Sequence, residues 1–358
     1  MRALINKSSA LVLLVAQVGL HPLQHIGLVF MVQMNESLTI DPVEESSRLG
    51  ALLREDLQGV LRRRGAVVGV SGGVDSAVVL ALCVRALGAE KVLAVFLPER
   101  ESSPDSLALA SSFAEHLGVQ TISEDITSAL EGAGCYRRRD EAIQRVFPDF
   151  REGWVSKITL PGSLLEQETL NVFTLTVVNP AGEEFSKRLP NRELFQIIAA
   201  SNFKQRLRMS MLYYHAELNQ YAVIGTANKN EHELGFFVKY GDGGVDIALI
   251  QHLYKSQVYQ LAEHLEIPHA ITSRPPTSDT YSAGSTQEEF FFRLSFDVLD
   301  SIWAMWEDGA EADEIAAKLQ LKAGQVQRVI EDIIRKRTTT EYLRTVPREY
   351  ALANRGEG

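Results

Sequence analysis

The segment Ser71-Gly72-Gly73-Val74-Asp75-Ser76 carries the strongest chemical signal in the sequence. Adjacent glycines let the backbone turn tightly and bring N–H groups close to an anion, and a following helix N-terminus adds its dipole. The hydroxyl groups of Ser71 and Ser76 are further donors. The Asp75 carboxylate would repel phosphate unless a cation lay between them, so it predicts a Mg²⁺ ligand. The Gly-Lys-Ser/Thr ending of a Walker A loop is missing, so we expect another kind of phosphate loop, with an ordinary capping turn as the alternative.

Residues 225–258 form a second polar stretch, in which acids, a threonine and lysines follow a predicted strand. Thr226 comes directly after the strand expected at 221–225, and ligands of doubly wound sheets bind at the carboxyl ends of strands. Glu231 follows closely, and two acids beside phosphate suit a hard cation. The charged, glycine-rich run at 239–246 favours close approach to a polar ligand. A solvated helix acid and a solvated turn are the alternatives for these residues.

The elements around these residues alternate between short apolar runs and helical periodicity. Ala66–Val70 is typical of a buried parallel strand, and it leads directly into the glycine-containing loop. Helices are expected at 42–64, 77–87 and 106–117, and strands at 66–70, 91–97 and 119–126. This order predicts an α/β fold with a doubly wound parallel sheet and helices on both faces.

The pattern changes between about residues 131 and 195. Strands are expected at 158–160, 172–178 and 185–189, the last two joined by the Asn179-Pro180-Ala181-Gly182 turn. We interpret this region as a small β-rich insertion. Helical periodicity then returns at 195–218, at 254–265 and, as two helices, at 311–337.

The N-terminal segment is apolar at 9–32 and follows Arg2 and Lys7, but His21 and Pro22 interrupt it. The expected explanation is a start that is not native, with the working chain beginning near Met34. A real packing segment and a targeting segment are the alternatives. The expected organisation is an N-terminal extension at 1–41, a main domain at 42–345 and a tail at 346–358.

Composition indicates a globular chain. Its 358 residues are 45% hydrophobic and 23% charged, with a formal net charge of −10. The acidic balance argues against broad nucleic-acid binding, and no span suits a membrane. Cys83 and Cys135 have no metal-ligand spacing, and two thiols in a chain of this size indicate a reducing, cytoplasmic location.

The loop sequence SGGVDS resembles the pyrophosphate-binding signature of the N-type ATP pyrophosphatases. These enzymes cleave ATP between the α- and β-phosphates and adenylate a substrate oxygen. The stretch GTANKNEHELGFFVKYGDGGVDIALIQHLYKSQV at 225–258 is similar to the corresponding segment of ammonia-dependent NAD synthetases. Weaker similarity extends from about residue 42 to 340, excluding the insertion. The resemblance implies the adenine nucleotide alpha hydrolase-like fold.

The resemblance also implies roles for particular residues. Asp75 and Lys255 would be catalytic, and Asp75 and Glu231 would hold Mg²⁺. Arg206 lies twenty residues before Thr226, which is the family's spacing between a substrate-binding arginine and an ATP-binding threonine. The residues implied to bind ATP are Gly69, Ser71, Gly72, Gly73, Val74, Asp75, Ser76, Thr226, Lys255 and Thr277. Those implied to bind the dinucleotide substrate are Arg206, Lys239, Asp246 and Lys336.

Two of these assignments rest on partial motif matches. Thr277 lies in Pro276-Thr277-Ser278-Asp279, which is similar to a Pro-Thr-Ala-Asp element of the family. Lys336 lies in Arg335-Lys336-Arg337, where the family has a His-Lys-Arg run followed by prolines. A hydrogen-bonded turn and a basic helix end are the alternatives for Thr277 and Lys336, respectively.

The implied reaction joins ATP, deamido-NAD and ammonia to give NAD, AMP and pyrophosphate through an acyl adenylate. The family resemblance implies a homodimer, and the chain has no room for a glutamine-hydrolysing domain, so free ammonia or a separate ammonia-supplying protein is expected. Because the insertion and the unusual run at 280–289 flank the substrate side, an enzyme acting on a different carboxylate is the first alternative. A non-catalytic nucleotide-binding relative is the second.

Overall fold

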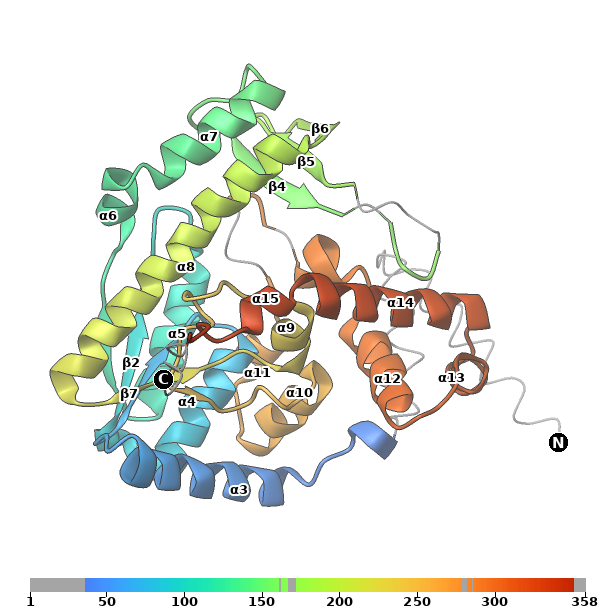
Figure 1. Cartoon of the computed structure of the whole chain (residues 1–358). Coiled ribbons are helices and arrows are strands. Elements are labelled where there is room, and N and C mark those ends of the chain that lie inside the picture. The colour runs from blue at the N-terminus through green and yellow to red at the C-terminus, as the bar shows by residue number, and fades with distance from the viewer. Residues whose placement is uncertain (1–35, 161, 167–171, 278–281, 285, 351–358) are drawn as a thin grey trace, which may run out of the picture.

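A parallel sheet of five strands forms the centre of the fold in the computed structural model (Figure 1), which describes residues 36–160, 162–166, 172–277, 282–284 and 286–350. The strand order is β3-β2-β1-β7-β8, and every neighbouring pair is parallel. The strands are β1 (Ala66–Gly69), β2 (Val92–Phe96), β3 (Gln120–Ser123), β7 (Ala222–Gly225) and β8 (Ile247–Ala248). β1 and β2 are short apolar runs with nearly every residue buried, as a sheet covered on both faces requires.

Helices cover both faces of this sheet. Alternate strand residues point to opposite faces, so Val68 and Ile224 pack in one core while Val67 and Val223 pack in another. The first core includes residues from α3 (Pro42–Glu55), α4 (Val74–Leu87), α5 (Pro104–His116) and α10 (Lys255–His264). The second includes residues from α6 (Thr127–Gly132) and α8 (Asn191–Asn219), the long helix that crosses Figure 1. The predicted α/β fold is therefore confirmed.

The predicted first helix, 42–64, is divided in two. Asp41 caps α3 by accepting hydrogen bonds from Val43 N and Glu44 N at 2.9 and 3.0 Å, and Pro42 occupies the first turn. A π-helical turn at Asp56–Val60 follows α3 and leads the chain into β1.

A second unit, formed by α7 (Cys135–Val146), a three-stranded sheet and the first turns of α8, has a hydrophobic core of its own. Its antiparallel sheet has the order β4-β5-β6, from β4 (Val155–Thr159), β5 (Thr174–Val178) and β6 (Glu184–Arg188). The predicted hairpin is confirmed, with Val177 opposite Phe185. The β-rich description of 131–195 was wrong for its first part, because α7 is a helix packed on α8. Its buried positions 135, 136, 139, 142 and 143 recur at helical spacing, so the helix was readable from the sequence.

The C-terminal helices form a second, all-helical layer at the right of Figure 1. They are α12 (Phe296–Glu307), α13 (Ala312–Leu319), α14 (Ala323–Thr339) and α15 (Glu341–Arg344), so the two helices predicted within 311–337 are confirmed. Trp303, Val329 and Ile333 pack in their common core. Short helices α9 (Lys229–Leu234) and α11 (His269–Thr272) lie between this layer and the parallel sheet.

Several expectations lie outside the described residues. These are the N-terminal segment up to residue 35, the tail from 351, and residues 278–281 and 285 beside Thr277. Within the part of the chain that the structure describes, no helix is long and apolar enough to cross a membrane.

Candidate active site

The glycine-containing loop connects the carboxyl end of β1 to the start of α4. Gly72 has a φ of +85°, and a side chain there would bring its Cβ to 2.4 Å from the carbonyl oxygen of Ser106. Gly73 occupies the position before the first turn of α4. The Ser76 hydroxyl donates to Gly73 O at 3.0 Å and accepts from Ser71 N at 3.3 Å. The loop is thus held in a tight turn that brings its backbone to the N-terminus of α4, as an anion site requires.

Lys255 and Asp75 form an ion pair at the centre of the candidate site. The ammonium group donates to Asp75 Oδ2, and the Lys255 side chain is only 1% exposed. Asn228 Nδ2 donates to the other carboxylate oxygen, Oδ1, at 3.0 Å. The structure therefore brings together the two residues predicted to be catalytic, which are 180 positions apart in the sequence.

Glu231 lies at the start of α9, where it forms a reciprocal capping box with Asn228. Glu231 N donates to Asn228 Oδ1 at 3.1 Å, and Asn228 N donates to Glu231 Oε2 at 3.2 Å. Gln287 Nε2 donates to the remaining oxygen, Oε1, at 3.1 Å. Both oxygens of Glu231 are therefore held in a fixed orientation.

The electrostatics of this cluster show an excess of negative charge. Burial, followed by the neighbouring charge of Asp75, raises the pKa of Glu231 above its ordinary value. Burial alone would lower the pKa of Lys255, but the charges of Asp75 and Glu231 outweigh it and raise that pKa. One buried lysine thus faces two carboxylates. A further cation would offset the negative charge that the lysine leaves uncompensated.

The donor set suits a divalent cation that shares its ligands with phosphate. No group of three or more His, Cys, Asp or Glu side chains placed to hold a metal exists among the described residues. Asp75 and Glu231 would therefore supply two oxygen ligands, leaving the other positions to phosphate oxygens and water. Mg²⁺ is commonly bound in proteins in this way.

Arg206 and Lys239, both predicted to bind the substrate, lie beside each other. Arg206 Nε donates to the carbonyl oxygen of Lys239 at 3.3 Å. The Lys239 ammonium group donates to Tyr342 O at 2.8 Å and to Thr345 O at 2.7 Å. The C-terminal segment therefore lies directly against this part of the site.

The carboxylate of Asp246 makes two hydrogen bonds within the protein. Its Oδ2 accepts from Val223 N at 2.8 Å, and its Oδ1 accepts from Tyr213 OH at 3.0 Å. Asp242 in the same loop accepts from Val238 N at 2.7 Å. Asp246 therefore attaches the 239–246 loop to β7, whereas Asp242 makes a local contact, and the substrate-binding role of Asp246 stays a prediction.

The structure does not bring Lys336 to the other predicted substrate residues. Its ammonium group pairs with Asp332 at 2.7 Å, donates to Phe291 O at 2.7 Å and lies 4.5 Å from the centroid of the Phe291 ring. The local motif gave no indication of this aromatic surrounding, because Phe291 lies 45 positions away. A role for Lys336 on the substrate stays a prediction.

Thr226 and Thr277, both predicted to contact ATP, lie on different segments of the fold. Thr226 directly follows β7 and is half-buried. Thr277 forms an isolated antiparallel bridge with Thr286, next to the Gln287 that contacts Glu231. Their predicted contacts with ATP stay predictions.

Four residues of the cluster and its surroundings were not identified from the sequence: Asn228, Asn230, Gln287 and Asp300. The Asn228-x-x-Glu231 spacing was a readable capping signal. Gln287 is 56 positions from Glu231, and Asp300 is 70 positions from Asn230, so no local pattern connects either pair.

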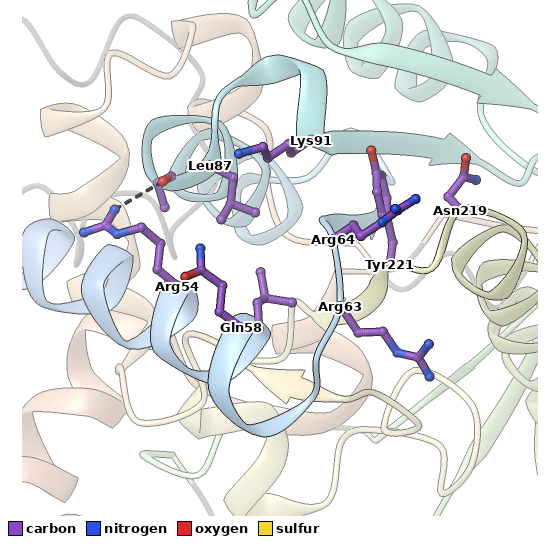
Figure 2. Close-up of a pocket in the computed structure, with 10 residues that line it drawn as sticks. Arg54, Gln58, Arg63, Arg64, Leu87, Lys91, Asn219 and Tyr221 are labelled. Atoms are coloured by element: carbon purple, nitrogen blue, oxygen red, sulfur yellow. Dashed lines mark hydrogen bonds between the residues drawn. The ribbon is translucent and has the colours of Figure 1, made fainter.

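A cavity of about 530 Å³ lies at the opposite end of the sheet (Figure 2). Its lining includes Arg64, Lys91 and Tyr221, which precede β1, β2 and β7 respectively. Arg54 also lines it and donates to Ala86 O at 3.2 Å, near the end of α4. Cations here complement the negative ends of helices. The cavity therefore lies at the amino ends of the strands and is separate from the cluster around Asp75, which lies at their carboxyl ends.

Comparison with known proteins gives one consistent family. The family model described as NAD synthase matches residues 46–145 and 163–347. An NH(3)-dependent NAD(+) synthetase of Mesorhizobium japonicum is 47% identical over 310 residues, covering 87% of this chain and 97% of that protein. The proteins of the same name from Rhizobium meliloti and Thermotoga maritima are 46% and 39% identical, covering 87% and 79% of this chain and 93% and 92% of their own lengths.

Solved structures share the fold. An NMN synthetase from Francisella tularensis aligns with a TM-score of 0.59 at 23% identity, covering 87% of this chain and 99% of that one. An NH3-dependent NAD synthetase from Campylobacter jejuni aligns with a TM-score of 0.56 at 22% identity, covering 87% and 100%. At these identities the alignments establish a common architecture.

Proposed function

The chain belongs to the NAD synthase family, and we propose that it amidates deamido-NAD to NAD, using ATP and ammonia and releasing AMP and pyrophosphate. The observation that carries this proposal is the cluster of Asp75, Glu231 and the buried Lys255 at the carboxyl end of the sheet, next to the glycine-containing loop. A carboxylate is a poor electrophile, so a chemical step that adenylates it must precede attack by ammonia.

In the first step, the nicotinate carboxylate of deamido-NAD attacks the α-phosphorus of ATP. An O–P bond forms, and the bond to the pyrophosphate leaving group breaks. The backbone N–H groups and hydroxyls of Ser71–Ser76 bind the β- and γ-phosphates. Lys255, held in a buried position, donates to phosphate oxygens as negative charge develops. We also assign contacts with ATP to Thr226, Thr277 and Gly69.

Asp75 and Glu231 are the proposed ligands of Mg²⁺. Their two carboxylates share one buried lysine, so a bound divalent cation would relieve their repulsion and neutralise the charge of the phosphates. The capping box and Gln287 hold Glu231 in the required orientation.

In the second step, ammonia attacks the acyl carbon of the adenylate and the C–O bond to AMP breaks. AMP leaves with the oxygen that came from the substrate carboxylate, and the attacking nitrogen loses a proton. We assign the dinucleotide to the side of the site formed by Arg206 and Lys239, whose cationic side chains suit its phosphates. Asp246 and Lys336 complete the proposed substrate contacts.

The proposal includes a homodimer in a reducing, cytoplasmic setting. Phe195, Tyr214 and Leu218 on α8 are 56% to 67% exposed, which suits a surface covered by a second copy. Cys83 and Cys135 are buried free thiols, as expected in reducing conditions.

The test is NAD formation by the purified full-length protein with deamido-NAD, ATP, Mg²⁺ and ammonium. NAD and AMP should appear in equal amounts, and Asp75→Ala should abolish both products. The matched control is Asp313→Ala on the exposed surface of α13, which should keep wild-type activity. A folded wild-type protein that forms AMP with nicotinate mononucleotide or another carboxylate, and not with deamido-NAD, would instead support the alternative acceptor.

A further inference from the structure

The N-terminus of α10 is capped by side chains from two other helices. Lys255 and Ser256 are its first two residues, and their N–H groups have no partner within the helix. Lys255 N donates to Asn230 Oδ1 at 3.0 Å, and Ser256 N donates to Asp300 Oδ2 at 2.9 Å. Asn230 belongs to α9 and Asp300 belongs to α12. The start of α10 is therefore fixed by tertiary contacts.

Asn230 and Asp300 are joined to each other. Asn230 Nδ2 donates to Asp300 Oδ1 at 2.5 Å. Both residues are 0% exposed, and Lys255 is 1% exposed. The amide of Asn230 thus connects the Asp300 carboxylate to the backbone of Lys255.

The local cap of α10 is incomplete, because Gln257 Oε1 accepts from Tyr254 N at 3.0 Å and the N–H groups of Lys255 and Ser256 donate to distant side chains. The residue before the helix is Tyr254, whose hydroxyl group donates to Glu307 Oε2 at 2.7 Å, away from the helix donors. Most helices use a nearby Ser, Thr, Asp or Asn side chain at this position. Here a fully buried carboxylate is used instead, although burying a carboxylate costs free energy.

Lys255 is the first residue of α10, so the contacts that fix this helix end also fix the point from which its side chain starts. From there the side chain reaches Asp75 across a buried space. Asp300 hydrogen-bonds to Asn230 and Ser256, and the structure shows no hydrogen bond from it to Asp75 or Glu231. Among the described residues, the hydrogen bonds of Asp300 therefore connect it to the site through the start of α10.

We propose that Asp300 is a positioning residue, which acts through Asn230 and the N-terminus of α10 to hold Lys255 in its catalytic position. This inference rests on the proposed function, because it assigns Lys255 to the adenylation step. It concerns the geometry of that step and adds no new contact with substrate.

The first test is Asp300→Asn, which keeps the side-chain shape but replaces one acceptor with an NH₂ donor. Both carboxylate oxygens of Asp300 accept hydrogen bonds, so the new NH₂ group must face one of two other donors, Asn230 Nδ2 or Ser256 N, and one hydrogen bond is lost. We expect kcat for NAD formation to fall by about 10- to 100-fold, because small displacements of a catalytic group have effects of this size. KM for deamido-NAD should stay within about 2-fold. The matched control is Asp297→Asn, an exposed aspartate one turn earlier on α12, which should keep wild-type kcat.

The decisive test repeats Asp300→Asn in a Lys255→Met background. If Asp300 acts through Lys255, the second substitution should cause less than about a 2-fold further loss, since contacting residues are not additive. A further loss as large as in the wild-type background would overturn the inference. So would an Asp300→Asn protein that is folded and retains wild-type kcat.

Asn230→Ala decides the question if Asp300→Asn does not fold. It should lower kcat by about 10-fold or more and lose this effect in the Lys255→Met background, by the same reasoning. Wild-type kcat in Asn230→Ala, or an equal loss in both backgrounds, would overturn the inference. A wild-type protein that forms no NAD overturns the proposed function and this inference with it, whereas wild-type activity that these variants retain overturns the inference alone.

Discussion

The ammonium group of Lys255 donates to Oδ2 of Asp75, so the two residues assigned to catalysis are each other's charge partner. Glu231 adds a second carboxylate to the same buried space, and its pKa is raised by burial and by Asp75. The lysine offsets one of the two negative charges. In the proposed mechanism, Lys255 is the cation beside the departing pyrophosphate, and Asp75 and Glu231 are the metal ligands.

Replacement of Lys255 by methionine should remove the stabilisation of developing phosphate charge. We expect kcat for NAD formation to fall by about 100- to 1,000-fold, the usual effect of losing one group that stabilises a transition state. Steady-state kinetics of Lys255→Met would measure this loss. Lys318→Met, at an exposed lysine of α13, serves as the control. A Lys255→Met enzyme with kcat within 3-fold of wild type, on the order expected for a surface change, would remove Lys255 from the mechanism.

Gln287→Ala should weaken the use of Mg²⁺. Gln287 Nε2 holds Glu231 Oε1 at 3.1 Å, and loss of such an outer partner commonly reduces metal affinity by about 10- to 100-fold. The concentration of Mg²⁺ that gives half-maximal activity should rise accordingly, while saturating Mg²⁺ restores much of kcat. Gln327→Ala on the exposed face of α14 should leave the Mg²⁺ dependence unchanged. An unchanged Mg²⁺ dependence in Gln287→Ala would show that this contact does not orient a metal ligand.

Glu101 should give the protein a defined sensitivity to acid. Burial alone would raise its pKa, but Arg139 at 2.5 Å and Lys204 at 2.7 Å outweigh burial and lower the pKa to about 2. Because the pKa is lower in the folded state, this carboxylate stabilises the fold above its ordinary pKa of 4.5. The contribution is lost as pH falls from about 4.5 to about 2.

Denaturant unfolding of Glu101→Gln tests this prediction. At pH 7 the variant should be less stable by about 3 kcal/mol, because the buried Arg139 and Lys204 each lose one charged partner and keep only Asp140 and Glu99, respectively. The difference from wild type should shrink progressively below pH 4.5. Glu152→Gln, at an exposed glutamate, should match wild type at every pH. A constant difference between pH 7 and pH 3 would contradict a pKa of about 2 for Glu101.

Gly72→Ala should damage the phosphate loop. The new Cβ would lie 2.4 Å from Ser106 O, and the φ of +85° disfavours a side chain, at a cost of about 1–2 kcal/mol before the clash is counted. We expect KM for ATP to rise by about 10-fold or more, since the donors of the loop shift away from the phosphates. ATP binding by calorimetry would measure the change. Gly59→Ala is the control, because Cβ at Gly59 meets nothing within 4 Å. Normal ATP affinity in Gly72→Ala would exclude the loop as the phosphate site.

The sequence by itself determined the features that depend on local order. The apolar run at Ala66–Val70 predicted β1, and the strand–glycine turn–helix order predicted the loop at Ser71–Ser76. The hairpin around Asn179–Gly182 was readable from its turn residues. The helical spacing of the buried positions in α7 at Cys135–Val146 was readable too, although this region was interpreted as β-rich.

Only the tertiary structure decided which side chains meet. Lys255 reaches Asp75 because α10 packs against α4, and Asp300 caps α10 because α12 packs on its other side. The same packing turned Lys336 toward Phe291, where its motif had predicted a substrate contact. Hydrophobic periodicity specifies which face of a helix is buried, but it carries no information about which distant helix will cover that face. The contacts that build this site depend on that choice.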